Sequence, residues 1–115
     1  MPWEGLNQRA FPRVTTQCDL IIHDRIGGTI KAKTQNLGLG GLCVLLDRSL
    51  EKLSQVHLRL ALTKANPPVE CDGRIVWMVR TKEPVASRPT FDIGIEFLNL
   101  KLGDKDQISS FIGHA

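Results

Sequence analysis

The chain has 115 residues, which is enough for one domain and too few for two separate hydrophobic cores. Hydrophobic residues make up 42% and charged residues 23%, an ordinary globular composition, so intrinsic disorder, collagen and low-complexity sequence are excluded. The formal net charge of +3 favours anionic partners, but basic and acidic residues are interleaved along the chain. A small anionic ligand therefore suits this charge better than a nucleic acid polymer, which usually needs a clustered excess of basic residues.

No apolar stretch approaches the length of a transmembrane helix, and the N-terminus lacks a basic region followed by an apolar one. We therefore expect a cytoplasmic protein with no membrane insertion. The cysteines are odd in number and lack CxxC spacing: Cys18, Cys43 and Cys71. We interpret them as small apolar core residues rather than as a disulfide framework or a zinc site.

An alternation of apolar and polar residues with period two dominates the chain and predicts β-strands. The predicted strands cover residues 14–23, 29–34, 42–46, 56–62, 69–79 and 91–97. A turn with two glycines is expected over 24–28, and a glycine-rich break over 36–41. Gly73, inside the fifth run, predicts a bulge or bend, and Trp77 and Val79 are assigned to the apolar face of that strand.

The pattern changes to helical spacing at the C-terminal end. Asp104 and Gln107 resemble a capping box, and Ile108, Phe111 and Ile112 follow on one helical face. The sequence thus predicts an all-β fold, a six-stranded antiparallel barrel with a short C-terminal helix that plugs one end. Residues 1–12 fit neither pattern and are expected to form an arm, with the barrel and helix over 13–115.

Two segments are not explained by core packing. Arg9 and Arg13 lie four residues apart on the arm, and Pro12 between them favours an extended chain. Planar guanidinium groups bind phosphates and the O6/N7 edge of guanine bidentately. Solvated arginines near a terminus are the alternative interpretation.

The second segment runs from Asn36 to Gly41 and also contains Gly38 and Gly40. Glycines allow close approach of a ligand to the backbone, and the Asn36 amide can both donate to and accept from a purine edge. The segment lacks the Gly-Lys-Ser/Thr ending of a P-loop, and no helical pattern follows it as in a Rossmann fingerprint. A tight barrel corner is the alternative.

Together, Arg-x-x-x-Arg before the first strand and Asn-x-x-x-Gly-Gly after the second resemble the PilZ domain family. The segments GRIVW (73–77) and FDIGIEF (91–97) are similar to that family's fifth and closing strands. The resemblance covers roughly residues 9–112. It implies a PilZ-type barrel acting as a bacterial receptor for cyclic di-GMP, with no other cofactor.

Carried onto this chain, the resemblance assigns ligand binding to Arg9, Arg13, Asn36, Gly38, Gly40 and Gly41. Gly38 departs from the family's Asp/Asn-x-Ser-x-x-Gly pattern, because it stands where serine is usual. A lost neutral hydrogen bond weakens affinity about three- to tenfold. Uncharged Gln8, just before the first motif arginine, favours one ligand per chain rather than a stacked pair.

The leading hypothesis is a receptor whose arm orders on cyclic di-GMP and presents a new surface to a downstream effector protein. A degenerate PilZ-like adaptor that binds no nucleotide is the main alternative. An oligonucleotide-binding barrel is less favoured because aromatic residues make up only 5% of the chain. An enzyme is not expected, since no catalytic set is recognisable, and His23 and His57 fall on polar strand faces typical of solvated histidines.

Overall fold

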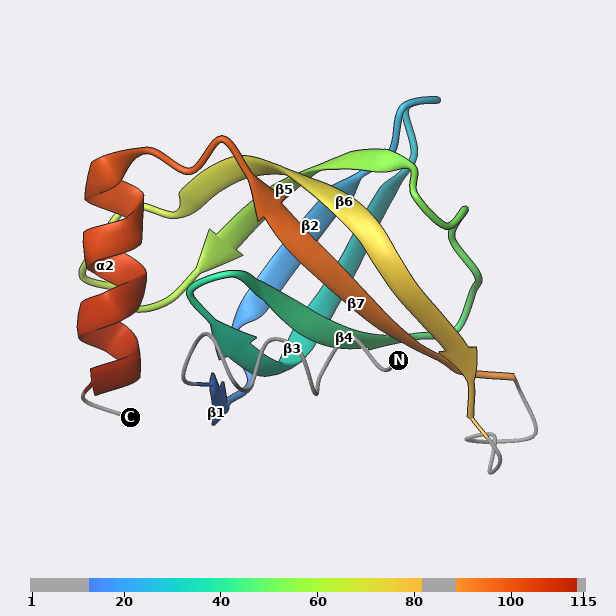
Figure 1. Ribbon diagram of the computed structural model, residues 1–115, viewed down its shortest axis with the longest axis horizontal. Helices are drawn as coiled ribbons and strands as arrows, with labels where there is room; N and C mark the ends of the chain where they lie inside the picture. The colour runs from blue at the N-terminus through green and yellow to red at the C-terminus, as the bar shows by residue number, and fades with distance from the viewer. Residues whose placement is uncertain (1–12, 82–88, 114–115) are drawn as a thin grey trace.

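The computed structural model describes residues 13–81 and 89–113 and confirms the predicted fold, an antiparallel six-stranded barrel with a helix at one end (Figure 1). The strands are β1 (Arg13–Thr15), β2 (Asp19–His23), β3 (Thr29–Gly38), β4 (Gly41–Leu46), β5 (Gln55–Ala61), β6 (Val69–Arg80) and β7 (Phe91–Leu98), and the helix is α2 (Leu102–Gly113). Around the barrel the strands follow the order β3-β2-β5-β6-β7-β4, and pairing of β4 with β3 closes it. The short β1 extends this sheet by pairing with the far end of β3.

The first predicted strand, 14–23, is wrong in one respect, because the structure divides it into β1 and β2. Both strands pair with β3, but their registers differ by one residue. The fully buried Thr34 occupies the break: its hydroxyl accepts a hydrogen bond from the Cys18 N–H (2.9 Å) and donates one to the Thr16 carbonyl (2.7 Å). The side chain thus adds to two backbone hydrogen bonds that span the break, from the Thr34 N–H to the Cys18 carbonyl (3.0 Å) and from the Thr16 N–H to the Gln35 carbonyl (3.2 Å).

The predicted glycine-rich break over 36–41 is also shorter than expected. Strand β3 continues to Gly38, because β1 supplies hydrogen-bonding partners for residues 36–38. Only Leu39 and Gly40 connect β3 to β4. The turn is held against β7, where the Phe97 N–H donates to the Gly40 carbonyl (2.9 Å).

The predicted bulge at Gly73 lies elsewhere. Gly73 pairs regularly, and the register shift between β6 and β7 falls between Ile75 and Trp77. An inserted residue inverts the alternation that follows it, so Met78 packs against the core, whereas Trp77 and Val79 lie on the outer face. The assignment of Trp77 and Val79 to the apolar face is therefore wrong.

Gly73 instead serves the packing of the core. A Cβ built at this position would lie 2.7 Å from the Ile95 Cγ2 and 2.8 Å from the Leu58 Cδ1. Both side chains are fully buried and cannot move away without disturbing their neighbours. Glycine is needed here because the barrel wall approaches its own core closely.

The helix confirms the predicted plug but not the predicted cap. It begins at Leu102, so Asp104 lies within the first turn instead of preceding it. Ile108 is fully buried, and Phe111 and Ile112 pack against the core from the same side. Among residues 13–81 and 89–113, no helix has the length and hydropathy needed to cross a bilayer.

Candidate functional site

The structure brings the end of the arginine motif onto the asparagine–glycine segment. In the β1–β3 pair, Arg13 lies opposite Gly38 and Thr15 lies opposite Asn36. Adjacent strands are about 4.8 Å apart, so these backbone positions are direct neighbours although more than twenty residues separate them in sequence. Arg9, the other predicted arginine, lies outside the described residues.

The break at Thr34 determines where the arm meets the barrel. The hydrogen bonds of Thr34 fix residues 16–18 against β3, and β1 begins at Arg13 with its register already set. The first described residue, Arg13, therefore lies beside Gly38, at the end of β3. Local sequence signals did not predict this placement, because it depends on the bulge.

The glycines of the motif take ordinary backbone conformations. Among the described glycines, only Gly27 in the β2–β3 turn has φ in the left-handed region, at 90°. Gly38 is extended within β3, Gly41 begins β4 opposite Glu96, and both are buried. What glycine contributes at Gly38 and Gly41 is therefore small size rather than an unusual turn.

A continuous row of outward-facing positions crosses the barrel from this point. Cross-strand pairing joins five residues on β1, β3, β4, β7 and β6: Thr15, Asn36, Cys43, Gly94 and Trp77. We call this row the motif wall. Asn36 and Trp77 are half-buried, whereas Cys43 and Gly94 are buried.

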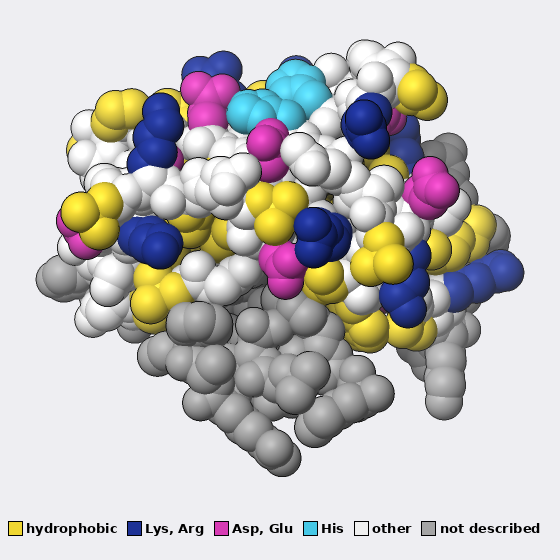
Figure 2. Space-filling model, turned by 45° about the horizontal axis from the view of Figure 1, so that its top comes forward, with side chains coloured by type: hydrophobic (Ala, Val, Ile, Leu, Met, Phe, Trp, Pro, Cys, Tyr) yellow, Lys and Arg dark blue, Asp and Glu magenta, His cyan; other side chains and the backbone are white. Residues whose placement is uncertain are grey.

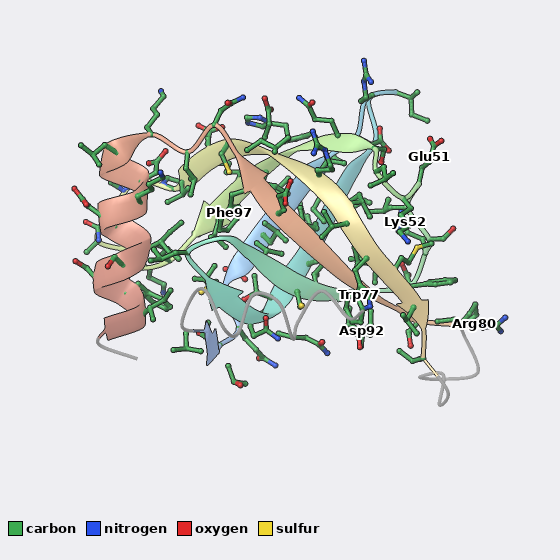
Figure 3. All side chains as sticks on the ribbon, viewed as in Figure 1. Glu51, Lys52, Trp77, Arg80, Asp92 and Phe97 are labelled. Carbon is green, nitrogen blue, oxygen red and sulfur yellow. The ribbon has the colours of Figure 1, made fainter. Side chains whose placement is uncertain are left out.

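Trp77 is the site residue that the sequence analysis missed. Simple alternation placed it in the core, and only the extra residue at Val76 turns it onto the motif wall. Asp92, two residues before Gly94, occupies the next outward position, and Figure 3 shows Trp77 and Asp92 at the same part of the wall. An indole beside a glycine offers a flat apolar face on which a base can stack.

Two cations on strands of this wall form ion pairs. Lys33 lies 3.8 Å from the Asp19 carboxylate, and the Arg74 guanidinium lies 3.5 Å from the Glu96 carboxylate. Glu96 separates Arg74 from Gly41 along the strand register.

Cys18 and Cys71 match their predicted role in the core, whereas Cys43 is buried on the outer side of β4, in the motif wall. All three are free and buried. Burial, followed by the nearby carboxylates of Asp104 and Asp72, raises the pKa of Cys71 to about 12. A thiol held protonated in this way is a poor nucleophile.

The motif wall borders an apolar groove. The groove, of about 420 Å³, runs between the barrel and α2 and is lined by Val14, Leu39, Ser109, Ile112 and Gly113. Val14 directly follows Arg13, and Leu39 directly follows Gly38. Each motif is thus followed directly in the sequence by a residue that lines the groove beside the helix.

Comparisons with known proteins agree with this geometry. In fold, the chain is similar to the Escherichia coli YcgR PilZ domain with c-di-GMP, at 15% identity and a TM-score of 0.76, covering 93% of this chain and 90% of that one. It is also similar to Bacillus subtilis MotI/DgrA, an inhibitor of motility, at 16% identity and a TM-score of 0.73. This match covers 90% of this chain and 49% of MotI/DgrA. The match to the K. pneumonia MrkH–c-di-GMP complex has 14% identity and a TM-score of 0.72. It covers 89% of this chain and 49% of MrkH.

The chain thus spans about half the length of MotI and of MrkH. No curated protein sequence matches it. The model of one family, described as the PilZ domain, matches residues 7–114 and so covers both motifs, the barrel and the helix. The chain belongs to the PilZ domain family.

Proposed function

We propose that this protein is a non-enzymatic receptor for cyclic di-GMP. The observation that carries the proposal is the β1–β3 register, which sets the end of the arginine motif directly beside Asn36 and Gly38. Membership of the PilZ family supports the same ligand, since the similar YcgR and MrkH structures contain c-di-GMP. Cyclic di-GMP carries two phosphates and two guanines, so it supplies both the anions and the base edges that these residues recognise.

Each residue then has a distinct role in the proposed complex. Arg9 and Arg13 bind phosphate and the guanine O6/N7 edge, where charge-assisted bidentate contacts are strongest. Asn36 hydrogen-bonds a guanine edge. The small Gly38, Gly40 and Gly41 allow the ligand to approach the backbone at the end of the barrel.

Trp77 extends this site along the motif wall. It lies three strands from Asn36 in the cross-strand order, about 14 Å along the curved outer surface of the barrel at the usual strand spacing. That separation suits an elongated ligand with a base at each end. Trp77 stacks on one guanine, while Asn36 and the arginines hold the other end.

We further propose that the signal is transmitted by the arm, residues 1–12, together with its junction at Arg13. Ligand bound by Arg9 and Arg13 fixes the arm relative to the barrel and creates a surface for a downstream effector protein. The apolar groove lined by Val14 and Leu39 adjoins this junction. Its position supports a readout surface beside α2.

Isothermal titration calorimetry with cyclic di-GMP, GMP and GTP tests the proposal. We expect low-micromolar affinity or better for cyclic di-GMP and much weaker binding of the mononucleotides. A stoichiometry of one is expected, because Gln8 adds no charge to neutralise a second ligand, and Gln8→Arg should raise it. Absence of binding to cyclic di-GMP would instead favour an adaptor that has lost its ligand.

A further inference from the structure

Two loops meet at the end of the barrel opposite α2 and form a surface that we call the loop end (Figure 1). One is the β2–β3 turn, residues 24–28, and the other is the β4–β5 connection, residues 47–54. Residues of both line one hollow of about 210 Å³. Figure 2, in which the top of Figure 1 comes forward, shows hydrophobic, basic and acidic side chains interleaved over this side of the barrel, without an extended patch of one charge.

Each of the two loops exposes a large apolar side chain. Ile26 is 95% exposed and Leu53 is 67% exposed. The Asp24 Oδ1 accepts hydrogen bonds from the N–H groups of Ile26 (3.1 Å) and Gly28 (2.7 Å). In the other loop, the Leu53 N–H donates to the Ile75 carbonyl (2.6 Å). Because hydrogen bonds already fix both loops, contact with a partner would cost little conformational entropy.

Leu53 adopts a backbone conformation that leucine rarely takes. Its φ of 68° lies in the left-handed region, where glycine or asparagine is usual. Leu53 does not belong to the hydrophobic core, so core packing does not explain a leucine at this position. Single exposed apolar residues are ordinary on protein surfaces. Two of them, on fixed loops that share one hollow, indicate a contact surface.

The hollow places an apolar recess beside an apolar projection. Leu50 and Val56, which belong to the core or pack against it, lie among the residues that line it, and so does Ile26. A cavity of about 150 Å³ holds benzene, so a hollow of about 210 Å³ has room for one aliphatic side chain. A surface with a projection and a recess side by side can be self-complementary about a two-fold axis, which is the relation that a symmetric dimer requires.

The charges of the loop end are also balanced. Its two segments carry as many basic as acidic residues: Arg25, Arg48, Lys52, Asp24, Asp47 and Glu51. Arg48 pairs with Asp47 (3.2 Å), and the Asp24 carboxylate accepts the hydrogen bonds of its own turn. Among the described residues, no ion pair engages Arg25 or Glu51, which line the same hollow. A two-fold axis through the hollow would bring Arg25 of each copy towards Glu51 of the other.

We propose that the loop end is the contact surface of a symmetric dimer of this chain. Ile26 of each copy enters the hollow of the other, and two ion pairs between Arg25 and Glu51 border the contact. The balanced charge favours a second copy over an anionic membrane or a nucleic acid, since both of these select an excess of basic residues. Helix α2 and its groove lie at the opposite end of the barrel, so the dimer leaves them accessible (Figure 1).

Sedimentation equilibrium of the full chain, from about 10 μM to about 1 mM, tests the proposal. We expect a reversible equilibrium between monomer and dimer, because two short loops form a small interface. Ile26→Asp should raise the dissociation constant of the dimer at least about tenfold. Leu102→Asp is the matched control: Leu102 is 75% exposed but lies on α2, so its replacement should leave the dimer unchanged.

Mixing two charge-reversal variants tests the two-fold relation itself. In a dimer of Arg25→Glu, or in a dimer of Glu51→Arg, like charges would face each other, so each variant alone should be mainly monomeric. An equimolar mixture of the two should dimerise, because each copy supplies the charge that the other lacks in both ion pairs. Ion pairs formed within one copy would give no such recovery.

Three outcomes would overturn the proposal. A monomer over the whole concentration range would remove the dimer. A dimer of unchanged strength in Ile26→Asp would place the contact elsewhere on the molecule. A mixture of the charge-reversal variants that stays monomeric, with both variants folded by circular dichroism, would exclude the two-fold pairing of Arg25 with Glu51.

Discussion

The motif wall and a second set of outer residues, the histidine wall (His23, His57, Glu70 and Asp72), belong to one barrel but differ in their charged groups. The described row of the motif wall, from Thr15 to Trp77, contains no lysine or arginine. The histidine wall has its titratable groups on three adjacent strands, already within contact distance. In the proposed function the first wall takes its positive charge from the arginine motif, whereas the second is built entirely from the barrel.

This difference has a thermodynamic consequence. Fixing an arm costs conformational entropy, so binding at the motif wall couples a chemical signal to a change in the chain. The histidine wall consists of residues that the barrel already holds in contact, so no segment has to be ordered to assemble it. A receptor needs the first kind of site, since a ligand shifts an equilibrium only when it binds two states differently.

The largest effect should come from removing the arginine charge at the start of β1. Arg13→Ala is expected to weaken cyclic di-GMP binding about 10- to 100-fold, the cost of losing charged hydrogen bonds. Arg59→Ala, on β5, is the control and should leave affinity unchanged. Calorimetry of both variants decides whether the motif wall depends on the arginine motif. Equal losses in both would mean that only the overall charge matters.

The second prediction concerns the base-stacking end of the motif wall. Trp77→Ala should weaken binding about tenfold or more, because stacking on an aromatic side chain contributes about 1–3 kcal/mol per base. Trp77→Phe should retain most of the affinity. Full affinity in Trp77→Ala would confine the ligand to the region near Asn36 and shorten the proposed site.

The inner face of β6 offers a test of packing that is separate from both sites. Gly73→Ala should lower the free energy of unfolding by about 1–3 kcal/mol, because the new methyl group meets Ile95 and Leu58. Gly103→Ala is the control, since a Cβ there has no neighbour within 4 Å. Urea denaturation of both variants measures the difference. Equal free energies of unfolding for the two variants would show that the barrel wall can shift at Gly73 to accommodate the methyl group.

Alkaline pH should weaken the fold through Cys71. Its pKa is about 12 in the folded protein and 9.0 ordinarily. The unfolded chain therefore loses this proton first, and stability falls between pH 9 and pH 12. From pH 9 to pH 10 the fall is about 1 kcal/mol. Cys71→Ala should show a flatter dependence in urea denaturation at each pH. An unchanged slope would contradict the assignment to Cys71.

The smallest effect is expected at Gly38. Its extended backbone in β3 accepts an L side chain, so Gly38→Ser should fold and tighten cyclic di-GMP binding about three- to tenfold. The gain would show that a hydroxyl restores the usual family contact on the motif wall. A loss of affinity, measured by the same calorimetry, would mean that the ligand occupies the space that glycine leaves.

Much of this protein follows from the sequence alone. Period-two alternation predicted the strands, because a barrel wall buries one face and hydrates the other. Helical spacing of Ile108, Phe111 and Ile112 predicted the plug for the same reason. The two motifs, with Arg13 and Asn36 as their anchors, identified the family. All of these signals lie within short stretches of chain.

Only the tertiary structure decided which of these residues meet. The break at Thr34 brings Arg13 beside Gly38, and the extra residue at Val76 turns Trp77 outward. His23 and His57 become neighbours because β2 and β5 pair. A bulge shifts the register by one residue and moves every later side chain of the strand to the other face of the sheet. It depends, however, on hydrogen bonds to a strand that is distant in the sequence. No local pattern contains that information.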